Sequence, residues 1–393
     1  MEAREAIVIG AGPAGLATAA MLKKRGIDVL VLERDEAVGS SWRKHYDRLH
    51  LHTVRWLSHL PGYRFSRKHG RWVSRDGVIR YLEGYTRHHG LDVRTGTEVS
   101  AIERMEGGWL LGTPSGDITA RHVVVATGYN HTPFIPDFPG KESFTGELTH
   151  ASTYRNPEPY RGRDVLVVGS GNTGAEIAVD LAEGGASRVR LAVRTPPNIV
   201  LRELNGLPNQ VTGVLFRHFP PKVVDTIAFA TRKGAIGDLS QYGLPLPERG
   251  VYTRVLEDDV IPVIDVGLID AVKRGEVEIV GGVEGFDGAG VLLAGGERIQ
   301  PEAVIVATGW LRALEPLVGK YGVLGHKGRP VVHGPDTHPD APRMYFIGYS
   351  NPISGMFREL NIDSRRIARA VDRDRRRTGE TGPLEARREP VAA

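Results

Sequence analysis

The sequence predicts an α/β fold with two parallel-sheet domains, the second inserted into a discontinuous first. Three observations support this prediction. An apolar run followed by a Gly-rich turn and an Ala-containing helix pattern occurs twice, beginning at Ala6 and at Val165. Each copy is followed later by an apolar strand pattern ending in Ala-Thr-Gly, at 123–129 and 303–310. The chain has 393 residues, more than one hydrophobic core usually holds. We therefore expect two dinucleotide-binding, Rossmann-type domains.

The first Gly-rich turn has the spacing G-x-G-x-x-G and lies between a strand pattern and a helix pattern. In such turns the three glycines permit a tight turn, close approach of a pyrophosphate and close packing of the helix. A second strand pattern, 29–32, ends in Glu33, whose carboxylate can accept hydrogen bonds from the hydroxyls of an unphosphorylated ribose. A Gly-rich turn without a ligand is the alternative. The predicted binding residues are Gly10, Gly12, Pro13, Ala14, Gly15, Glu33 and Arg34.

An irregular stretch rich in His, Arg and Trp follows Glu33 and continues to about Trp72. Such sequence directly after the first strand–helix–strand unit is suited to lining a bound ring system, although a surface loop is the alternative for any single residue. The candidates in this stretch are Ser41, Trp42, Arg43 and His52, and Gly128 is the candidate in the first Ala-Thr-Gly turn.

The second Gly-rich turn repeats the first, but the strand after it ends differently. Where the first unit has Glu33, the second has Arg194. An arginine there can pair with a 2′-phosphate, which predicts NADPH rather than NADH, although a nearby loop could reverse that preference. The predicted binding residues are Gly169, Gly171, Asn172, Thr173, Gly174, Arg194, Thr308 and Gly309, with Arg202 as a weaker candidate.

The expected first domain covers 1–155 and 301–372, and the expected second domain covers 156–300. A basic, disordered tail is expected over 373–393. Pro-rich stretches at 134–139 and 156–159 predict two crossings between the domains. Within the second domain, 204–250 is a Gly-, Pro- and aromatic-rich insertion around a helix pattern from Lys222 to Ala230. We expect it to cover the domain or the substrate entrance, or to touch a membrane surface.

Composition excludes several classes of site. The chain has no Cys, which rules out disulfides, thiolate metal sites and redox Cys pairs, and we expect no metal. Nine Arg and five acidic residues over 365–393 account for the whole net charge of +4, which indicates a solvated tail rather than a nucleic-acid surface. A strand pattern begins close to Met1 and no apolar run approaches a membrane span, so we expect a cytoplasmic protein without an integral membrane segment.

An acid in the first site and an arginine in the second predict a prosthetic FAD and an exchangeable NADPH. The chemistry then begins with hydride transfer from nicotinamide to flavin. A dithiol acceptor is excluded because there is no Cys. Oxygen, a quinone and a protein redox partner remain as electron acceptors.

The segment 144–154 matches F-x-G-x-x-x-H-x-x-x-[Y/F] and resembles the fingerprint of the flavin-containing monooxygenase family. Baeyer–Villiger relatives usually carry Trp where this chain has Tyr154. Within the family, the chain is similar to the plant YUCCA-type indole-3-pyruvate monooxygenases over nearly its whole length up to the basic tail. It departs from relatives at Trp310 and in segment 351–358. The similarity runs through residues 49–52, 135–140, 167–174, 262–267 and 307–309.

The resemblance implies a C4a-(hydro)peroxyflavin, formed from reduced FAD and O2, that oxygenates a small organic substrate. The first expectation is oxidative decarboxylation of a 2-oxo acid such as indole-3-pyruvate. N- or S-oxygenation of an amine or sulfide, and Baeyer–Villiger oxidation, are alternatives. A reductase or oxidase without oxygen insertion is a further alternative, and a non-catalytic redox-sensing flavoprotein is the last. The substrate and the oligomeric state stay open, a dimer included.

Four residues are candidates for the catalytic centre. Asn172 is a candidate donor in the nicotinamide–flavin cleft, with a helix cap as an equal alternative. His150 is favoured as an interdomain hinge or NADPH contact over a general base. Arg358 is a candidate for binding a substrate carboxylate, against a plainer ion pair with a surface acid. Asn351 follows the strand pattern 343–349 and precedes a helix expected at 359–371, whose N-terminal amides could face the flavin.

Overall fold

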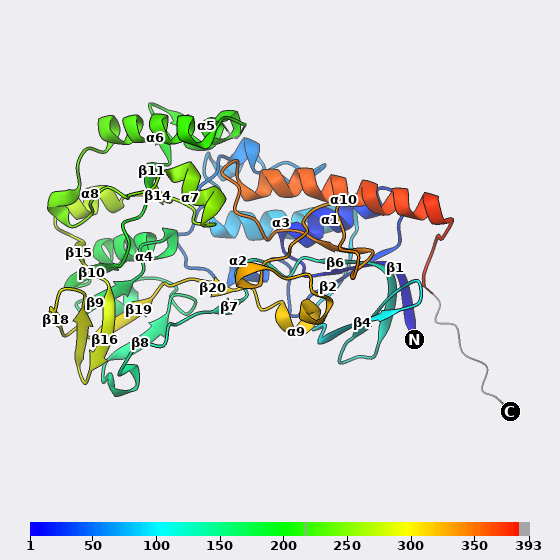
Figure 1. The fold of residues 1–393 in the computed structure, drawn as a ribbon, viewed down its shortest axis with the longest axis horizontal. Helices are drawn as coiled ribbons and strands as arrows, with labels where there is room; N and C mark the ends of the chain where they lie inside the picture. Colours follow the sequence, from blue (N-terminus) through cyan, green and yellow to red (C-terminus); the bar gives the residue numbers. More distant parts are fainter. Residues whose placement is uncertain (217, 385–393) are drawn as a thin grey trace.

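The computed structural model describes residues 1–216 and 218–384, which form two sheet-based domains at opposite ends of an elongated molecule (Figure 1). This confirms the predicted fold class. The first domain carries the N-terminal strand and the long C-terminal helix, and the second carries the middle of the chain.

The first sheet is built around β1 and β6, which pair in parallel from Glu2 with Ile118 to Ile9 with Val125. The strand order is β3-β2-β1-β6-β5-β4, and β21 pairs in parallel with the last residues of β6. The apolar strand pattern at 123–129 therefore returns the chain to the first sheet, as expected. The strands are β1 Glu2–Ile9, β2 Val29–Leu32, β3 Asp92–Arg94, β4 Ala101–Met105, β5 Gly108–Gly112, β6 Ile118–Val125 and β21 Met344–Phe346.

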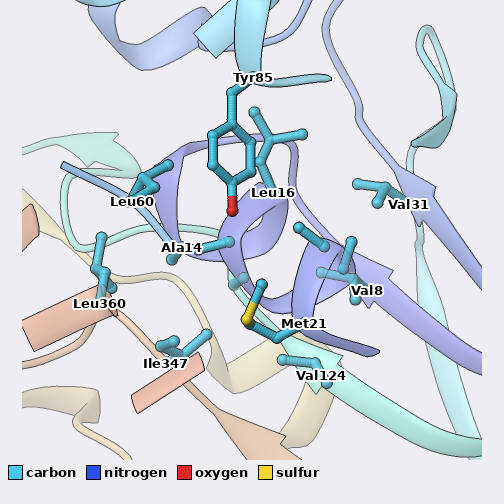
Figure 2. Close-up of a cluster of buried hydrophobic side chains, with 14 of the residues drawn as sticks. Val8, Ala14, Leu16, Met21, Val31, Leu60, Tyr85, Val124, Ile347 and Leu360 are labelled. Carbon is cyan, nitrogen blue, oxygen red and sulfur yellow. The ribbon is translucent and has the colours of Figure 1, made fainter. Parts of the chain in front are cut away.

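Helices α1 (Pro13–Lys23), α3 (Arg75–His89) and α10 (Met356–Thr378) belong to this domain. Side chains from them meet the apolar face of β1, β2 and β6 in a buried cluster, part of which is drawn in Figure 2. The Tyr85 ring lies among Leu16, Leu60 and neighbouring apolar groups, and its hydroxyl donates to the carbonyl of Pro61 at 2.9 Å. This core holds α1, and with it the first Gly-rich turn, against the sheet.

The second sheet is parallel throughout, with the order β15-β10-β9-β19-β8. Helix α4 follows the second Gly-rich turn and, with α8, packs its apolar residues into the core of this domain. A three-stranded antiparallel sheet, β16-β17-β18, follows β15. The elements are β8 Glu147–His150, β9 Asp164–Val168, α4 Asn172–Glu183, β10 Arg188–Val193, α8 Leu268–Lys273, β15 Glu278–Gly281, β16 Val283–Asp287, β17 Gly290–Leu293, β18 Arg298–Ile299 and β19 Ala303–Val306.

The strand pairing moves both expected domain boundaries. β8 lies before 155 and β19 lies after 300, yet both are strands of the second sheet. The Pro-rich stretch at 156–159 joins β8 to β9 within that sheet, so the second predicted crossing is wrong. The chain instead crosses at two neighbouring segments, where β7 (Thr132–Pro133) pairs antiparallel with β20 (Trp310–Leu311).

The expected disordered tail is also corrected. Helix α10 continues to Thr378, and its last turns carry alternating acids and arginines that pair with the domain. Asp372 pairs with Arg25 at 2.7 Å, and Asp374 pairs with Arg343 at 2.8 Å. Leu384 is buried, and its carbonyl accepts a hydrogen bond from the Thr119 hydroxyl at 2.6 Å. The tail prediction for 385–393 lies outside the described residues.

The insertion forms a layer over the second domain at the upper left of Figure 1. The predicted helix at 222–230 is present and longer, as α6 (Pro221–Ala235). The other elements are β11 Ile199–Leu201, which pairs with β14 Val263–Asp265, β12 Glu203–Leu204, which pairs with β13 Leu207–Pro208, and helices α5 Asn209–Phe216 and α7 Val251–Glu257. The remaining short helices are α2 Ser40–Arg43, α9 Glu315–Val318, η1 Arg55–Leu57, η2 Arg67–His69, η3 Lys141–Ser143, η4 Glu158–Tyr160, η5 Ser240–Tyr242, η6 Gly319–Tyr321 and η7 His326–Gly328.

Candidate functional site

The first Gly-rich turn has the backbone that its sequence predicts. Gly10 has φ +105°, in the region that favours glycine, and Gly12 immediately precedes α1 with Pro13 as the first helical residue. A Cβ on Gly15 would overlap the carbonyl oxygen of Gly10, so only glycine fits there. A Cβ on Gly12 would instead meet no atom of the described chain within 4 Å. The turn is thus tight on its inner side and open in front of the helix N-terminus.

Glu33 is held beside this turn. One carboxylate oxygen accepts a hydrogen bond from the backbone N–H of Ala11 at 2.7 Å, and the other accepts from that of Asp35 at 3.0 Å. The side chain is buried and aimed at the turn, as a ribose-binding acid should be. Arg34 is exposed, and its guanidinium lies 3.2 Å from the His131 ring, so it contributes to the rim of this site.

The candidates after Glu33 occupy different places. Trp42 lies edge-on to Phe357 at the start of α10, with ring centroids 6.2 Å apart. Its neighbour Ser41 is exposed on the same short helix. Arg43 pairs with Glu83 of α3, so its charge is already neutralised within the first domain.

His52 connects the two domains. Its Nε2 lies 2.5 Å from Oε1 of Glu176, a buried residue one turn into α4. The predicted cofactor contact of His52 stays a prediction, and the geometry adds a tie between the first domain and the helix that begins at the second Gly-rich turn. This tie positions one site relative to the other.

The second Gly-rich turn has the same geometry as the first. Gly169 has φ +113°, a Cβ on Gly174 would overlap the Gly169 carbonyl oxygen, and a Cβ on Gly171 would meet no described atom within 4 Å. Thr173 lies in the first turn of α4 and is partly buried. Two copies of one anion-binding turn therefore stand at the N-termini of α1 and α4.

Asn172 is neither a helix cap nor aimed at open space. Its Nδ2 donates to the carbonyl of Pro262 at 3.0 Å, and its Oδ1 accepts from the N–H of Ile264 at 2.7 Å. Gly171 occupies the cap position instead. Asn172 thus fastens the second turn to β14, which makes it a positioning residue for the turn.

Arg194 lies directly after β10, the strand next to the second turn. The residue is exposed, and it packs against Gly282, where a Cβ would lie 3.0 Å from the Arg194 Cα. Within the described part of the chain its guanidinium forms no hydrogen bond or ion pair. A cation so placed is available for a 2′-phosphate.

Each Ala-Thr-Gly turn comes shortly before one of the two paired crossing strands, β7 or β20. Gly128 and Gly309 have nearly equal φ values of +95° and +96°. The Thr308 hydroxyl donates to the carbonyl of Phe134 at 2.5 Å, and the Phe134 N–H donates to the Gly309 carbonyl at 3.1 Å. The second turn is thereby fastened to the segment that follows β7.

His150 uses both ring nitrogens to hold this crossing. Nδ1 accepts from the N–H of Ser152 at 3.0 Å, and therefore Nε2 carries the proton, which it donates to the Gly309 carbonyl at 3.0 Å. Burial lowers the pKa of His150, so the neutral ring is favoured. Both ring nitrogens are therefore engaged with backbone groups at the crossing, as a hinge residue requires. Tyr154 of the same motif donates to Asp180 of α4 at 2.7 Å.

The two C-terminal candidates have partners within the chain. Arg358 pairs with Glu359, whose carboxylate also accepts from the Ser354 hydroxyl at 2.6 Å. The plainer interpretation of Arg358 as one half of an ion pair is the one that the structure supports. Asn351 hydrogen-bonds to Tyr129, which follows the first Ala-Thr-Gly turn.

Sequence reasoning missed three interdomain contacts. Gln210 of α5 is buried, accepts from the Val54 N–H at 2.9 Å and donates to the Ser354 carbonyl at 2.7 Å, thereby fastening the insertion to the first domain. Arg312 is buried, stacks on Tyr129 and pairs with Asp259 at 2.9 Å. Arg202, foreseen only as a weak NADPH contact, stacks on Trp72 with its guanidinium carbon 4.4 Å from the ring centroid. No local pattern signals these contacts, because each joins segments more than 50 residues apart.

The residues present fit FAD and NADPH. In both turns the inner glycines are required by close packing, whereas the middle glycine leaves room in front of a helix N-terminus, as a pyrophosphate requires. Glu33 suits a ribose with two hydroxyls and Arg194 suits a phosphorylated one. Among the described residues no group of three or more His, Asp or Glu side chains could hold a metal ion, and no helix there is long and apolar enough to span a membrane.

Comparison with known proteins gives consistent results. Residues 7–200 match the family model described as pyridine nucleotide-disulphide oxidoreductase. Indole-3-pyruvate monooxygenase YUCCA1 of Oryza sativa subsp. japonica is 35% identical over 330 residues, which cover 81% of each chain. The probable indole-3-pyruvate monooxygenase YUCCA10 of Arabidopsis thaliana is 31% identical over 88% of this chain and 91% of its own.

Solved structures share the fold. A flavin-containing monooxygenase from Stenotrophomonas maltophilia superposes with a TM-score of 0.73, at 22% identity, over 95% of this chain and 99% of its own. Cyclohexanone monooxygenase with bound ε-caprolactone superposes with a TM-score of 0.71, at 18% identity, over 96% of this chain and 88% of that one. At such identities these likenesses establish the fold.

Proposed function

Because the chain belongs to the family of YUCCA-type indole-3-pyruvate monooxygenases, we propose that it oxidatively decarboxylates an aromatic 2-oxo acid, with indole-3-pyruvate as the first substrate to test. The chain is an FAD- and NADPH-dependent monooxygenase. One 2-oxo acid, O2, NADPH and a proton give a carboxylic acid shorter by one carbon, CO2, water and NADP⁺.

The observation that carries this proposal is the pair of matching turns with opposite charges beside them. Glu33 stands beside the turn at α1, and Arg194 directly follows β10, the strand that pairs with β9, which leads into the turn at α4. The flavin, when bound, supplies hydride acceptance and oxygen activation. The protein's residues bind the two cofactors at the two turns, and the tie between His52 and Glu176 fixes the distance between them.

A 2-oxo acid needs a cation for its carboxylate, and we propose Arg202 for this role. The other candidate, Arg358, pairs with Glu359. Arg202 is half-buried, and within the described chain its guanidinium forms no ion pair. The Arg202 guanidinium lies over the indole ring of Trp72. A cation of the second domain thus contacts an aromatic ring of the first domain at the junction between them. Burial lowers the pKa of Arg202, which increases the gain from a carboxylate partner. The aromatic group of the substrate would pack on the surface that Arg202 and Trp72 form.

Turnover of matched compounds tests the substrate class. The FAD-loaded enzyme would be assayed with NADPH, O2 and catalase against indole-3-pyruvate, its amide, a cyclic ketone, a tertiary amine and a thioether. The proposal expects the 2-oxo acid to be turned over at least tenfold more efficiently than the amide, because the amide lacks the charge. Preference for the amine, thioether or ketone would contradict the proposed substrate class, but it would leave the assignment as a monooxygenase unchanged.

Arg202→Gln tests the anchor, and Arg358→Gln is the matched control. We expect Arg202→Gln to raise KM for indole-3-pyruvate at least tenfold, roughly the worth of a buried charge-assisted contact, while KM for NADPH stays within twofold. Arg358→Gln should change both values less than threefold. A rise in KM for NADPH in Arg202→Gln would assign the residue to the cofactor instead.

The partners and location of the enzyme are proposals too. We propose that its partners are O2 and the small organic acid, and that nucleic acid is not among them. A cytoplasmic location is supported by the lack of Cys, since the chain has no use for an oxidising compartment. Fractionation of the source cells with an antibody against the chain would test the location.

A further inference from the structure

The insertion contains a pocket that neither cofactor accounts for. It lies between α6, β11 and the segment 246–251, and its volume is about 370 Å³. Figure 1 shows α6 along the outer edge of the second domain, with β11 and α7 beneath it. Small-molecule sites typically span ~300–1,000 Å³, so the pocket is large enough for a small ligand. Its lining includes no residue of either Gly-rich turn or of the predicted cofactor sites.

Most of the pocket wall is apolar. Ile199 and Val200 come from β11, Ala228 and Phe229 from α6, and Leu246 from the segment opposite. Phe229 and Leu246 are 53% and 47% exposed, so the apolar wall continues to the surface. Such a wall favours a ligand with an apolar body.

Arg232 provides a charge within this wall. The residue is only 8% exposed, and its Nε is buried without a hydrogen-bond partner. Burial lowers the pKa of Arg232, which shows how poorly its charge is solvated. A buried guanidinium nitrogen without a partner is costly, and an anion that enters the pocket would relieve that cost.

The other charged groups of the wall are already accounted for. Asp225 accepts from the N–H of Tyr252 and from the Thr253 hydroxyl, both at 2.6 Å, and so holds the start of α7. Arg249 pairs with Asp258 at 2.6 Å. Glu248 is exposed. Among the lining residues, all of which the structure describes, Arg232 is therefore the buried cation without an ion pair, and Asp238, which lies outside the lining, offsets its charge only in part.

We propose that this pocket binds a monocarboxylate with an apolar body, with the carboxylate on Arg232 and the body against β11 and α6. A guanidinium presents parallel N–H groups that match the two oxygens of a carboxylate. The two acids in the wall disfavour a more highly charged anion. Arylacetic acids and medium-chain fatty acids share this chemistry. The site is independent of the proposed reaction, because it uses none of the residues assigned to that reaction.

Isothermal titration of the full chain, loaded with FAD and NADP⁺, tests the site with four probes. Indole-3-acetate and decanoate have both a carboxylate and an apolar body, indole-3-acetamide lacks the charge, and acetate lacks the body. We expect at least one of the first two to bind tenfold or more tightly than both partial probes. Binding of indole-3-acetate alone identifies an arylacetate site, and binding of decanoate alone identifies a fatty-acid site.

Variants locate the binding. Arg232→Gln should weaken it at least tenfold, whereas Lys233→Gln, an exposed cation on the same helix, should leave it within twofold. Ala228→Phe fills the pocket and keeps Arg232, so it should also weaken binding tenfold, and it serves if Arg232→Gln fails to fold. Flavin reduction by NADPH should keep its rate in all three variants. Failure of both complete probes to bind, or binding that both pocket variants leave unchanged, would overturn the proposal.

Discussion

At the scale of single residues, charge and hydrogen-bond capacity separate cofactor contacts from structural ties. Glu33 and Arg194 occupy equivalent positions, each directly after the second strand of its unit. Glu33 is buried and hydrogen-bonded, whereas Arg194 is exposed and has no partner in the described chain. His150 and Asn172, in contrast, use their side-chain polar atoms in hydrogen bonds to backbone groups. The first pair should govern cofactor choice and the second pair should govern stability.

Arg194→Glu should reverse the preference between nicotinamide cofactors. The variant removes the cation for the 2′-phosphate and adds a repelling carboxylate, as in the first site. Anaerobic reduction of the flavin should need at least tenfold more NADPH for half-maximal rate, while the NADH value changes little or improves. An unchanged NADPH requirement would show that another residue binds the phosphate.

His150→Ala should act on stability rather than on acid–base chemistry. The variant leaves the Ser152 N–H without its partner and removes one of the two donors to the Gly309 carbonyl, which keeps the Phe134 N–H, at a cost of about 1–3 kcal/mol in the free energy of unfolding. Urea unfolding would measure this loss. The pH profile of kcat/KM should keep its shape, and loss of one of its limbs would instead make His150 a proton donor or acceptor.

At the scale of elements, each Gly-rich turn combines one glycine that packing requires with one that a ligand requires. Gly15→Ala places a methyl group on the Gly10 carbonyl, so it should lower the stability of the protein with or without FAD. Gly12→Ala meets open space, so the apoprotein should keep its melting temperature within a few degrees while FAD binds at least tenfold more weakly. Equal FAD affinity in Gly12→Ala and wild type would contradict a pyrophosphate at this turn.

Strand β6 carries a histidine that should make the protein sensitive to mild acid. Burial lowers the pKa of His122 to about 4, whereas an unfolded histidine titrates near 6.5. Between these values the unfolded chain binds a proton that the folded chain does not, so stability falls as pH drops from 6.5 towards 4. The loss should approach about 3 kcal/mol. The carboxylate of Asp374, 3.8 Å from His122 Nε2, opposes the lowering of the His122 pKa, and the charges of Arg121 and Arg343 reinforce it.

Urea unfolding at pH 7 and pH 5 would measure this effect. His122→Gln should reduce the difference between the two pH values, and His88→Gln, on the surface of α3, should leave it as in wild type. An equal pH dependence in His122→Gln and wild type would assign the acid sensitivity to other groups.

Helices and strands with regular patterns could be predicted from the sequence, whereas their ends could not. The helix around 222–230 and the C-terminal helix both continue beyond the predicted range. The C-terminal helix looked like a solvated tail because its last turns are mostly charged. Ion pairs with distant residues, such as Arg25 and Arg343, order it instead. Only the fold brings these partners together.

At the scale of the whole molecule, the two dinucleotide-binding units and the difference in charge between Glu33 and Arg194 could be predicted. Each unit depends on residues within one short segment of the sequence. The arrangement between the units could not. It depends on contacts between remote segments, of which His52 with Glu176 and Gln210 with Ser354 are examples. The domain boundaries shifted for the same reason, since β8 and β19 become neighbours only when the sheet forms.

Substrate recognition belongs to this larger scale. Arg202 directly follows β11 of the second domain and Trp72 belongs to the first domain, so the surface that they form exists only between assembled domains. From the sequence, Arg358 is a candidate for the carboxylate or for one half of an ion pair, and the structure shows the ion pair, with Glu359. We propose that oxygen insertion into a 2-oxo acid takes place at this junction.

The most direct test is a labelled turnover with the FAD-loaded enzyme, NADPH, ¹⁸O2 and indole-3-pyruvate, in the presence of catalase. The account predicts one indole-3-acetate with a single ¹⁸O in its carboxylate, and one CO2, for each NADPH consumed. Catalase is essential because free hydrogen peroxide decarboxylates 2-oxo acids without an enzyme. If catalase abolishes the product while NADPH oxidation continues, the enzyme is an oxidase and the claim fails.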